Sequence, residues 1–432
     1  MFKILVLLSL FVFSGCGGDV EGKLELVSPP EVEPSTYGAN YPDTELFDPQ
    51  NCNQIDIYCV SNVSDWDAVI SLKPNTVVFE TGKFDLGFNV IDFPVRLVSS
   101  KLWSAELSGD TFFRVESDNV IIEGFRFYSG ASPSGGRYSA ERYGNFWLEG
   151  NNIEILNNYF DSIGINSTVV DGTGIGIHIV NGFDIKIYNN TFIHSHAIAI
   201  KTSDSSKRIE VFNNDFLNSL SFGGSGEVFH IGDGYSIRQG MSPTDDRSES
   251  SFYRNYISNW SLEKELISIK SDQNSVYQNY IQGAKDGAIV IRMGNDNKVF
   301  DNHVNGNVNF PVRISGERNI IKGNYFCGTG VAISFHAEMV YETQLPKLYN
   351  SYWAANDNEI LDNEFYGYLA HGKIDEGDAA DPDYLASLPK GNLLQRNKFF
   401  INGDFNFDSF GFRMADNSYI DAKITCNYSG KI

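Results

Sequence analysis

The sequence predicts an all-β chain folded as a right-handed parallel β-helix, a solenoid that forms a single elongated domain. Two observations support this prediction: a strand-like motif that recurs from residue 152 to the C-terminal region, and spacings of 22–24 residues between several of its copies. A section of chain this short cannot bury its own apolar face, so it must stack on copies of itself.

Each copy alternates apolar and polar residues, then has an asparagine and a further apolar pair, as in Asn152-Ile-Glu-Ile-Leu-Asn-Asn-Tyr-Phe. This pattern is typical of a strand, a tight turn and a second strand. Asparagine suits the turn because it tolerates the left-handed conformation, and stacked asparagines can hydrogen-bond along the axis. The repeated residues are Asn158, Asn190, Asn214, Asn255, Asn279, Asn302, Asn324, Asn363 and Asn397.

The spacing also separates this fold from its main rival. A β-propeller needs about 40–45 residues per repeat, which the shorter gaps contradict. The longer gaps, 214–255, 324–363 and 363–397, are interpreted as loop insertions that project from one face and wall a binding groove.

The N-terminus predicts export. Lys3 precedes an apolar run over residues 4–13, which is too short to span a bilayer, and Ser14-Gly15-Cys16 follows. This end resembles the lipobox of bacterial lipoproteins, with an ordinary secretory signal as the alternative. We therefore expect a signal peptide over 1–15, a lipidated Cys16 with a flexible tether over 16–45, and the parallel β-helix with its loop insertions over 46–432. The expected location is the bacterial outer membrane or cell surface, and the lipid is the only expected membrane contact.

The remaining four cysteines can oxidise in an exported protein. We favour a Cys52–Cys59 bond, because these two are close in sequence, over metal binding, because no CxxC pair is present. The formal net charge of −22 argues against a nucleic-acid partner. A local basic cluster can still bind a polyanion, and we expect a monomer.

Three cations follow the period of the repeat. Lys270, Arg292 and Arg313 are 22 and 21 residues apart, about one coil each. Neighbouring strands lie about 4.8 Å apart, so the three should form a column. Opposed like charges repel one another, so such a column requires carboxylates or a bound polyanion.

Two carboxylates precede the first of these cations. Glu263 and Glu265 are two residues apart and point to one side of a strand. A hard divalent ion such as Ca²⁺ would keep both ionised. Strict alternation places Lys270 on the opposite side from Glu265, so a shared cleft requires a bend between them.

In these residues the chain resembles polysaccharide lyase family 6, which contains alginate lyases and chondroitinase B. The motif is Glu263-x-Glu265-x4-Lys270 with Arg292 one coil later. The resemblance implies that Lys270 removes the C5 proton of a uronate and that Arg292 helps to protonate the leaving oxygen. It also implies that Arg313 binds substrate, and that Ca²⁺ on Glu263 and Glu265 neutralises the substrate carboxylate.

Two positions depart from the family pattern. The family adds an asparagine ligand from an earlier coil, for which Glu227 and Asn218 are the candidates here. Met293 follows Arg292 where many relatives have histidine. Neutralisation of the uronate carboxylate is required in any case, because the adjacent proton is otherwise too weakly acidic.

The predicted function is therefore β-elimination on an acidic polysaccharide, with alginate ahead of dermatan or chondroitin sulfate. One alternative is a non-catalytic surface lipoprotein that binds glycans on the same coil. A second is a glycoside hydrolase, which needs two carboxylates in the groove. Asp245 and Asp246 are available for that role, but adjacent residues on a strand point apart.

Overall fold

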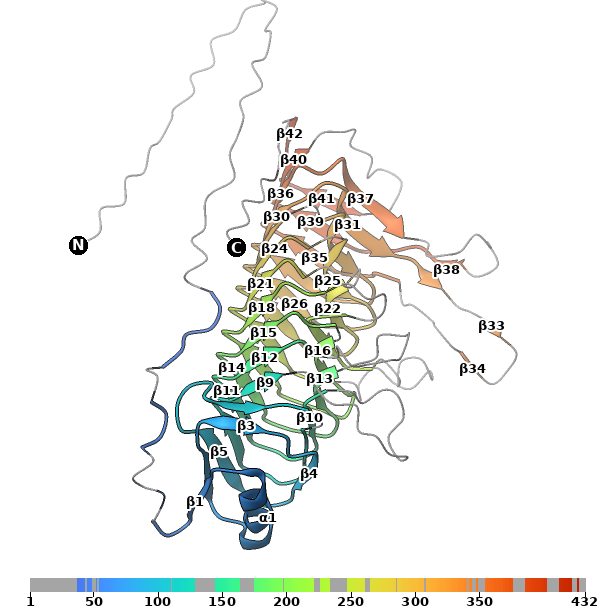
Figure 1. Cartoon of the computed structure of the whole chain (residues 1–432). Helices are drawn as coiled ribbons and strands as arrows, with labels where there is room; N and C mark the ends of the chain where they lie inside the picture. Colours follow the sequence, from blue (N-terminus) through green and yellow to red (C-terminus); the bar gives the residue numbers. More distant parts are fainter. Residues whose placement is uncertain are drawn as a thin grey trace, which may run out of the picture.

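The computed structural model confirms the predicted parallel β-helix (Figure 1). It describes residues 37–42, 45–48, 52, 54–109, 111–128, 144–163, 175–196, 198–220, 226–233, 247–260, 265–284, 286–306, 308–339, 342–343, 347–348, 354–375, 385–401, 412–421 and 426. The predicted signal peptide, Cys16, Glu263 and the Asp245–Asp246 pair lie outside these residues.

Three long parallel sheets form the faces of the solenoid, and each coil of the central region contributes one strand to each sheet. In the described residues, the first sheet contains β1 (Ile57–Val60), β2 (Thr76–Phe79), β5 (Val95–Ser99), β8 (Val120–Glu123), β11 (Ile153–Leu156), β14 (Lys186–Tyr188), β17 (Glu210–Phe212), β20 (Ser251–Tyr253), β23 (Ser275–Tyr277), β26 (Lys298–Phe300), β29 (Ile320–Lys322), β35 (Glu359–Leu361), β39 (Leu393–Gln395) and β41 (Arg413–Ala415). The second contains β4 (Phe88–Ile91), β7 (Phe112–Val115), β10 (Phe146–Leu148), β13 (Ile175–Ile179), β16 (Ile198–Thr202), β19 (Phe229–Ile231), β22 (Glu265–Ile269), β25 (Gly287–Ile291), β28 (Phe310–Ile314), β31 (Val331–His336) and β37 (Ala370–Asp375). The third contains β3 (Gly82–Phe84), β6 (Ala105–Leu107), β9 (Arg126–Tyr128), β12 (Tyr159–Asp161), β15 (Thr191–Ile193), β18 (Asp215–Leu217), β21 (Tyr256–Ser258), β24 (Tyr280–Gln282), β27 (His303–Asn305), β30 (Tyr325–Cys327), β36 (Glu364–Tyr366), β40 (Lys398–Ile401) and β42 (Ser418–Asp421).

Two small antiparallel pairs stand apart from these sheets. They join β32 (Glu338–Met339) to β38 (Leu385–Ser387) and β33 (Glu342–Thr343) to β34 (Lys347–Leu348). These pairs belong to the long gaps that the sequence predicted to be insertions, and they project beyond the ends of β31 and β37 (Figure 1).

The predicted asparagine column is present at the turn between the first and third sheets. All nine predicted asparagines are at most 1 % exposed. In each link the Oδ1 atom of one asparagine accepts the backbone N–H of the asparagine in the preceding coil, as Asn302 does from Asn279 at 3.1 Å. The column satisfies the polar groups that every turn would otherwise bury without partners.

The left-handed residue of this turn is not the ladder asparagine itself, as the sequence suggested, but the residue before it. Asn157, Arg254 and Asp301 have φ values of 58°, 55° and 55°. A second ladder, which sequence reasoning missed, occupies the turn between the second and first sheets; it contains Asn274, Asn297, Asn319, Asn358 and Asn392.

The helix α1 (Val63–Leu72) covers the N-terminal end of the solenoid (Figure 1). Its N-terminus is stabilised by Asp65, whose carboxylate accepts the backbone N–H groups of Ser61 and Asn62 at 2.8 and 3.1 Å. Trp66 inserts into the first coils and donates a 2.6 Å hydrogen bond to Asn89. The first coil is thereby shielded from edge pairing with another chain.

Residues 37–42, which we placed in the tether, lie against the outer face of the third sheet. The backbone of Gly38 donates to Arg254 O at 3.0 Å, Ala39 N donates to Asp215, and the Tyr41 ring makes an edge contact with Trp103. This part of the predicted tether is therefore docked on the β-helix.

Two disulfides are present in the described residues. One is the predicted Cys52–Cys59 bond, and the other joins Cys327 to Cys426 across 99 residues. No helix in the described residues is long and apolar enough to cross a membrane.

Candidate functional site

The candidate residues meet on the outer face of the second sheet because the strands there depart from strict alternation. Leu266 and Ile267 are adjacent, yet both pack into the core. In the pairing of β22 with β25, Glu265 lies opposite Gly287 and Ile267 lies opposite Ile289, while Leu266 has no partner in the register. This irregularity brings Glu265, Ser268 and Lys270 to one face and supplies the bend that the sequence required.

The irregularity is stacked along the sheet. Val228 and Phe229 of the preceding coil both enter the core, as do Ala288 and Ile289 of the following coil. Phe229 pairs in register with Ile267. Glu227 lies two residues before Phe229, and Glu265 lies two residues before Ile267, so the two glutamates stand beside each other. The two carboxylates come from neighbouring coils.

Lys270 and Arg292 form the predicted column, but Arg313 does not extend it. Lys270 N donates to Ile231 O at 2.8 Å, and Arg292 N donates to Ile269 O at 2.7 Å, so Arg292 follows Lys270 by one coil. The next position of this column is Ser315. Arg313 pairs with Val290, two residues earlier along the strand, because it follows Arg292 by 21 residues whereas this coil advances by 23, as from Ile291 to Ile314.

Both arginines nevertheless lie close to the carboxylate of Glu265. Its carboxylate forms an ion pair with Arg313, lies 3.8 Å from Arg292 Nη1 and accepts a 2.8 Å hydrogen bond from Ser268 Oγ. Burial alone would raise the pKa of this carboxyl group, but Arg313 and then Arg292 outweigh burial and lower it. Glu265 is therefore ionised at neutral pH.

Lys270 is itself only 6 % exposed, unlike an ordinary surface lysine. It acts electrostatically on Glu227, His230 and Glu265. The prediction that Lys270, Arg292 and Glu265 belong to one cluster is supported by this arrangement.

Glu227 and His230 form the buried side of the cluster. They are 4 % and 6 % exposed, and His230 Nδ1 lies 3.2 Å from Glu227 Oε1. Burial opposes ionisation of Glu227, but His230 and Lys270 lower its pKa. Burial, followed by the charge of Lys270, lowers the pKa of His230 and favours its neutral form.

His230 and Lys201 are the residues of this face that sequence reasoning missed. His230 is buried and lies in register between Lys201 and Ser268. Lys201 forms a 2.9 Å ion pair with Asp233. Comparing residues one coil apart would have placed both on the face that carries Lys270.

A divalent cation would find oxygen atoms here. The Oε2 atom of Glu227 is buried and has no hydrogen-bond partner among the described residues. Within the same residues, no group of three or more His, Cys, Asp or Glu is arranged around a metal position. Glu263 lies outside the description, and Glu265 faces the arginines, so Glu227 is the described residue that best fits a cation. Asn218, the other candidate, instead accepts a 3.1 Å hydrogen bond from Asn259.

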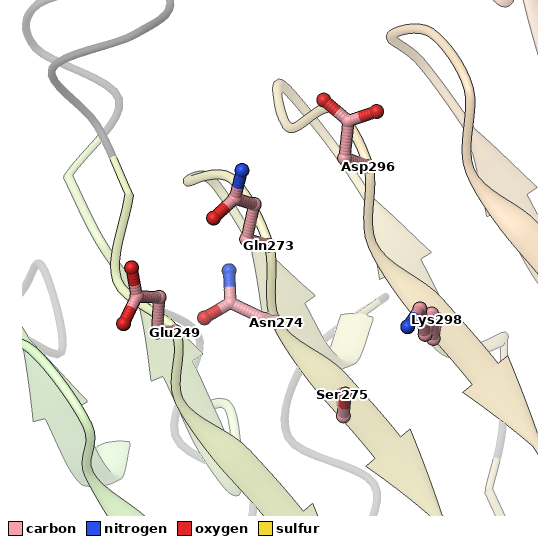
Figure 2. Close-up of a pocket in the computed structure, with 6 residues that line it drawn as sticks. All are labelled: Glu249, Gln273, Asn274, Ser275, Asp296 and Lys298. Carbon is pink, nitrogen blue, oxygen red and sulfur yellow. The ribbon is translucent and has the colours of Figure 1, made fainter.

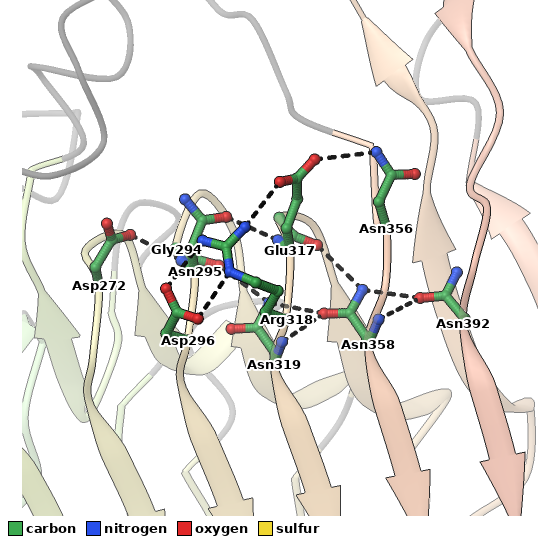
Figure 3. A network of polar contacts seen from close by, with 11 residues as sticks. Asp272, Gly294, Asn295, Asp296, Glu317, Arg318, Asn319, Asn356, Asn358 and Asn392 are labelled. Carbon is green, nitrogen blue, oxygen red and sulfur yellow. Dashed lines mark hydrogen bonds and ion pairs between the residues drawn. The ribbon is translucent and has the colours of Figure 1, made fainter.

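A polar hollow near this sheet is a different feature. A cavity of about 500 Å³ is lined by Glu249, Gln273, Asn274, Ser275, Asp296 and Lys298 (Figure 2). It lies at the turn between the second and first sheets, where the nearby polar groups already pair across coils: Arg318 binds Asp296 at 2.9 Å, and the asparagine ladder runs beside it (Figure 3). These contacts indicate a structural role.

Comparison with known proteins supports the fold. No family model and no curated sequence matches the chain. Among solved structures, a family 6 alginate lyase bound to a trisaccharide is 20 % identical, with a TM-score of 0.64 and coverage of 89 % of each chain. The chain shares the fold of the family 6 polysaccharide lyases.

Two further solved structures agree. A family 6 polysaccharide lyase from Pseudopedobacter saltans is 17 % identical, with a TM-score of 0.67, and the match covers 84 % of this chain and 92 % of that one. A mannuronic acid specific family 6 lyase from human gut microbiota is 16 % identical, with a TM-score of 0.66 and coverage of 87 % and 88 %. A periplasmic alginate epimerase is more distant, at 13 % identity and a TM-score of 0.52.

Proposed function

We propose that this chain is a polysaccharide lyase that cleaves a uronate-containing polysaccharide, alginate first, by β-elimination. The observation that carries the proposal is the buried Lys270 in register with Arg292, beside a carboxylate that two arginines hold ionised. The similarity to family 6 alginate lyases in fold supports the same reaction.

The reaction assigns one task to each group. Lys270, as the free amine, removes the C5 proton of the uronate next to the scissile bond. The electron pair of that C–H bond forms the C4–C5 double bond, the C4–O4 bond breaks, and the departing oxygen takes a proton with the help of Arg292. The product is a 4,5-unsaturated uronate end.

Elimination requires the charge of the substrate carboxylate to be neutralised. We assign this task to Arg313 and to a divalent cation, for which the resemblance implies Ca²⁺. Glu227 would bind this cation together with Glu263 and Glu265, although Glu265 would then have to release part of its contact with Arg313. The cation would supply Lewis acidity at the carboxylate.

The test is the ultraviolet absorbance of the unsaturated product during incubation with alginate, polymannuronate, polyguluronate and dermatan sulfate. We expect absorbance to rise with an alginate substrate, and mass analysis to show products with an unsaturated end. The absence of an absorbance increase on all four, with and without added divalent ions, would reject the lyase.

The alternative function, glycan binding without cleavage, makes a different prediction. A binding protein would retain the polysaccharide with the same affinity after Lys270→Ala and would never produce the unsaturated end. The same incubation, followed by affinity electrophoresis, separates the two functions.

We also propose that the chain is a lipoprotein anchored through Cys16 at the outer membrane or cell surface. The support is the apolar run followed by Ser14-Gly15-Cys16. Expression with a labelled fatty acid should label the parent and leave a Cys16→Ser variant unlabelled, and equal labelling would contradict the anchor.

A further inference from the structure

The face that carries Lys270 continues toward the N-terminal end of the solenoid, where it presents a tryptophan. Trp147 lies on β10 between Phe146 and Leu148, which both pack into the core, so its ring is on the outer face. The strand β10 is four strands before β22 in the second sheet (Figure 1). Neighbouring strands lie about 4.8 Å apart, so roughly 19 Å separates Trp147 from the coil of Lys270.

One column of side chains, the outer column, connects Trp147 to the candidate site. In register, it contains Arg114, Trp147, His178, Lys201, His230 and Ser268. None of these six described positions is acidic, although the chain has a formal net charge of −22. A line of cationic and hydrogen-bonding side chains is complementary to an acidic sugar chain, and the one aromatic ring in it can pack against a sugar.

The ring of Trp147 is held in one orientation. Its Nε1 atom donates a 2.8 Å hydrogen bond to Glu149 Oε1, and Glu149 Oε2 accepts a 2.8 Å hydrogen bond from Arg114 Nη2. The ring also makes an edge contact with His178, at a centroid distance of 4.8 Å and an interplanar angle of 74°. Because such contacts order the side chain before any ligand arrives, they reduce the entropy that binding costs.

The same contacts determine what Trp147 offers to a ligand. The indole N–H is the only polar group of this side chain, and it is already bonded to Glu149. Trp147 is partly exposed, so a ligand meets its apolar ring surface. The C–H groups on the face of a pyranose ring fit such a surface, whereas a carboxylate does not.

The cations beside Trp147 are accessible to a polyanion. The side chains of Arg114 and Lys201 are 27 % and 22 % exposed, although Arg114 pairs with Glu149 and Lys201 pairs with Asp233. An acidic sugar chain that reaches Trp147 therefore passes side chains that can bind its carboxylates and hydroxyl groups.

We propose that Trp147 is the sugar-stacking platform of a distant substrate subsite, and that the acidic polysaccharide lies along the outer column between Trp147 and Lys270. The inference rests on the proposed lyase function and adds which coils the substrate spans. The distance between strands is close to the length of one pyranose residue, so this subsite lies about four sugar residues from the uronate at Lys270. Longer chains therefore bind more tightly until they reach Trp147.

The first test measures elimination on purified alginate oligosaccharides, from the disaccharide to the octasaccharide. The kcat/KM of the parent should continue to rise beyond the tetrasaccharide, because shorter chains placed at Lys270 do not reach Trp147. This arm needs no variant. A kcat/KM that is constant from the trisaccharide upward overturns the inference.

The second test compares the parent with Trp147→Ala, Trp147→Phe and Tyr128→Ala on the same fragments. The ratio of parent to Trp147→Ala kcat/KM should grow about tenfold from the trisaccharide to the octasaccharide, and Trp147→Phe should recover most of this loss because it keeps an aromatic ring. Tyr128→Ala is the matched control, because Tyr128 is 42 % exposed on the third sheet, and it should follow the parent at every length. A ratio that does not change with length overturns the inference.

Calorimetric titration separates this inference from the lyase itself. In the Lys270→Ala background, adding Trp147→Ala should weaken binding of the octasaccharide about tenfold and should weaken binding of the trisaccharide much less. Elimination together with binding that does not depend on Trp147 rejects only this inference. Binding that depends on Trp147, in a parent that produces no unsaturated end, rejects only the lyase.

Discussion

Glu265 and Arg313 are 48 residues apart in the sequence, yet their side chains form an ion pair between coils that are two strands apart on the second sheet. The position opposite Glu265 on the intervening β25 is Gly287, which has no side chain to separate the two. The pair is 7 % and 15 % exposed. It fixes the positions of both side chains.

Replacing Glu265 should reduce stability in a pH-dependent way. The pKa of Glu265 is lowered in the folded chain, so its ionised form stabilises the fold above the unfolded pKa, and this contribution is lost as pH falls through the folded pKa. We expect Glu265→Gln to cost about 2–4 kcal/mol at pH 7 and much less near pH 3, as measured by denaturant unfolding. Asp362→Asn removes an exposed pair with Arg396 and should cost below about 1 kcal/mol. Equal losses would contradict a special role for the buried pair.

Replacing Lys270 should remove the base and retain the fold. A positioned acid–base group contributes roughly 10²–10⁴-fold to rate, so kcat of Lys270→Ala on the preferred polysaccharide should fall by that factor while KM changes only a few-fold. Lys298→Ala is the control, because this lysine is exposed and lies on the first sheet. A variant that keeps more than a tenth of the parent kcat would exclude Lys270 as the base.

The asparagine ladder should dominate stability in the centre of the solenoid. Asn279 bonds to Asn302, Phe252 and Tyr277, and its Oδ1 atom accepts from Asn255. Because truncation leaves several buried backbone groups unsatisfied, we expect Asn279→Ala to cost about 2–4 kcal/mol. The exposed Lys322→Ala should stay within about 0.5 kcal/mol. Urea unfolding measures both variants. If the unfolding midpoint of Asn279→Ala shifts as little as that of Lys322→Ala, the asparagine ladder is dispensable for stability.

The docked N-terminal segment should make stability depend on pH through Asp215. This residue accepts a hydrogen bond from Ala39 N at 3.2 Å, and burial raises its pKa to about 6. A carboxyl group with a raised folded pKa stabilises the fold while protonated, and this contribution is lost as pH rises from about 4 through 6. We expect Asp215→Asn to be about 1–2 kcal/mol more stable than the parent at pH 8 and equal to it at pH 4.

Thermal melting of both proteins between pH 4 and pH 8 tests this expectation. Parallel curves would mean that Asp215 titrates normally. A larger loss in the variant at high pH would mean that the charged carboxylate is needed for docking.

The sequence by itself determined the coil. The spacing of the asparagines, of which Asn279, Asn302 and Asn324 are the clearest, predicts the period, because each residue fills the same turn and bonds only to its neighbours. It also predicts the exported-type Cys52–Cys59 bond and the identity of Lys270, Arg292 and Glu265 as candidates. These features are local or repeat at a fixed interval, so a linear pattern reveals them.

Only the tertiary structure decided how these residues meet. The stacked irregularity at Leu266 turns Glu265 to the same face as Lys270. No residue in the sequence pattern predicts this irregularity. Arg313 follows Arg292 by 21 residues where the coil advances by 23, so it lies two residues outside the column, and its side chain forms an ion pair with Glu265. The burial of His230 depends on strands from neighbouring coils. Each strand alone shows only an alternating pattern, whereas the coils stacked on either side of a side chain set its environment.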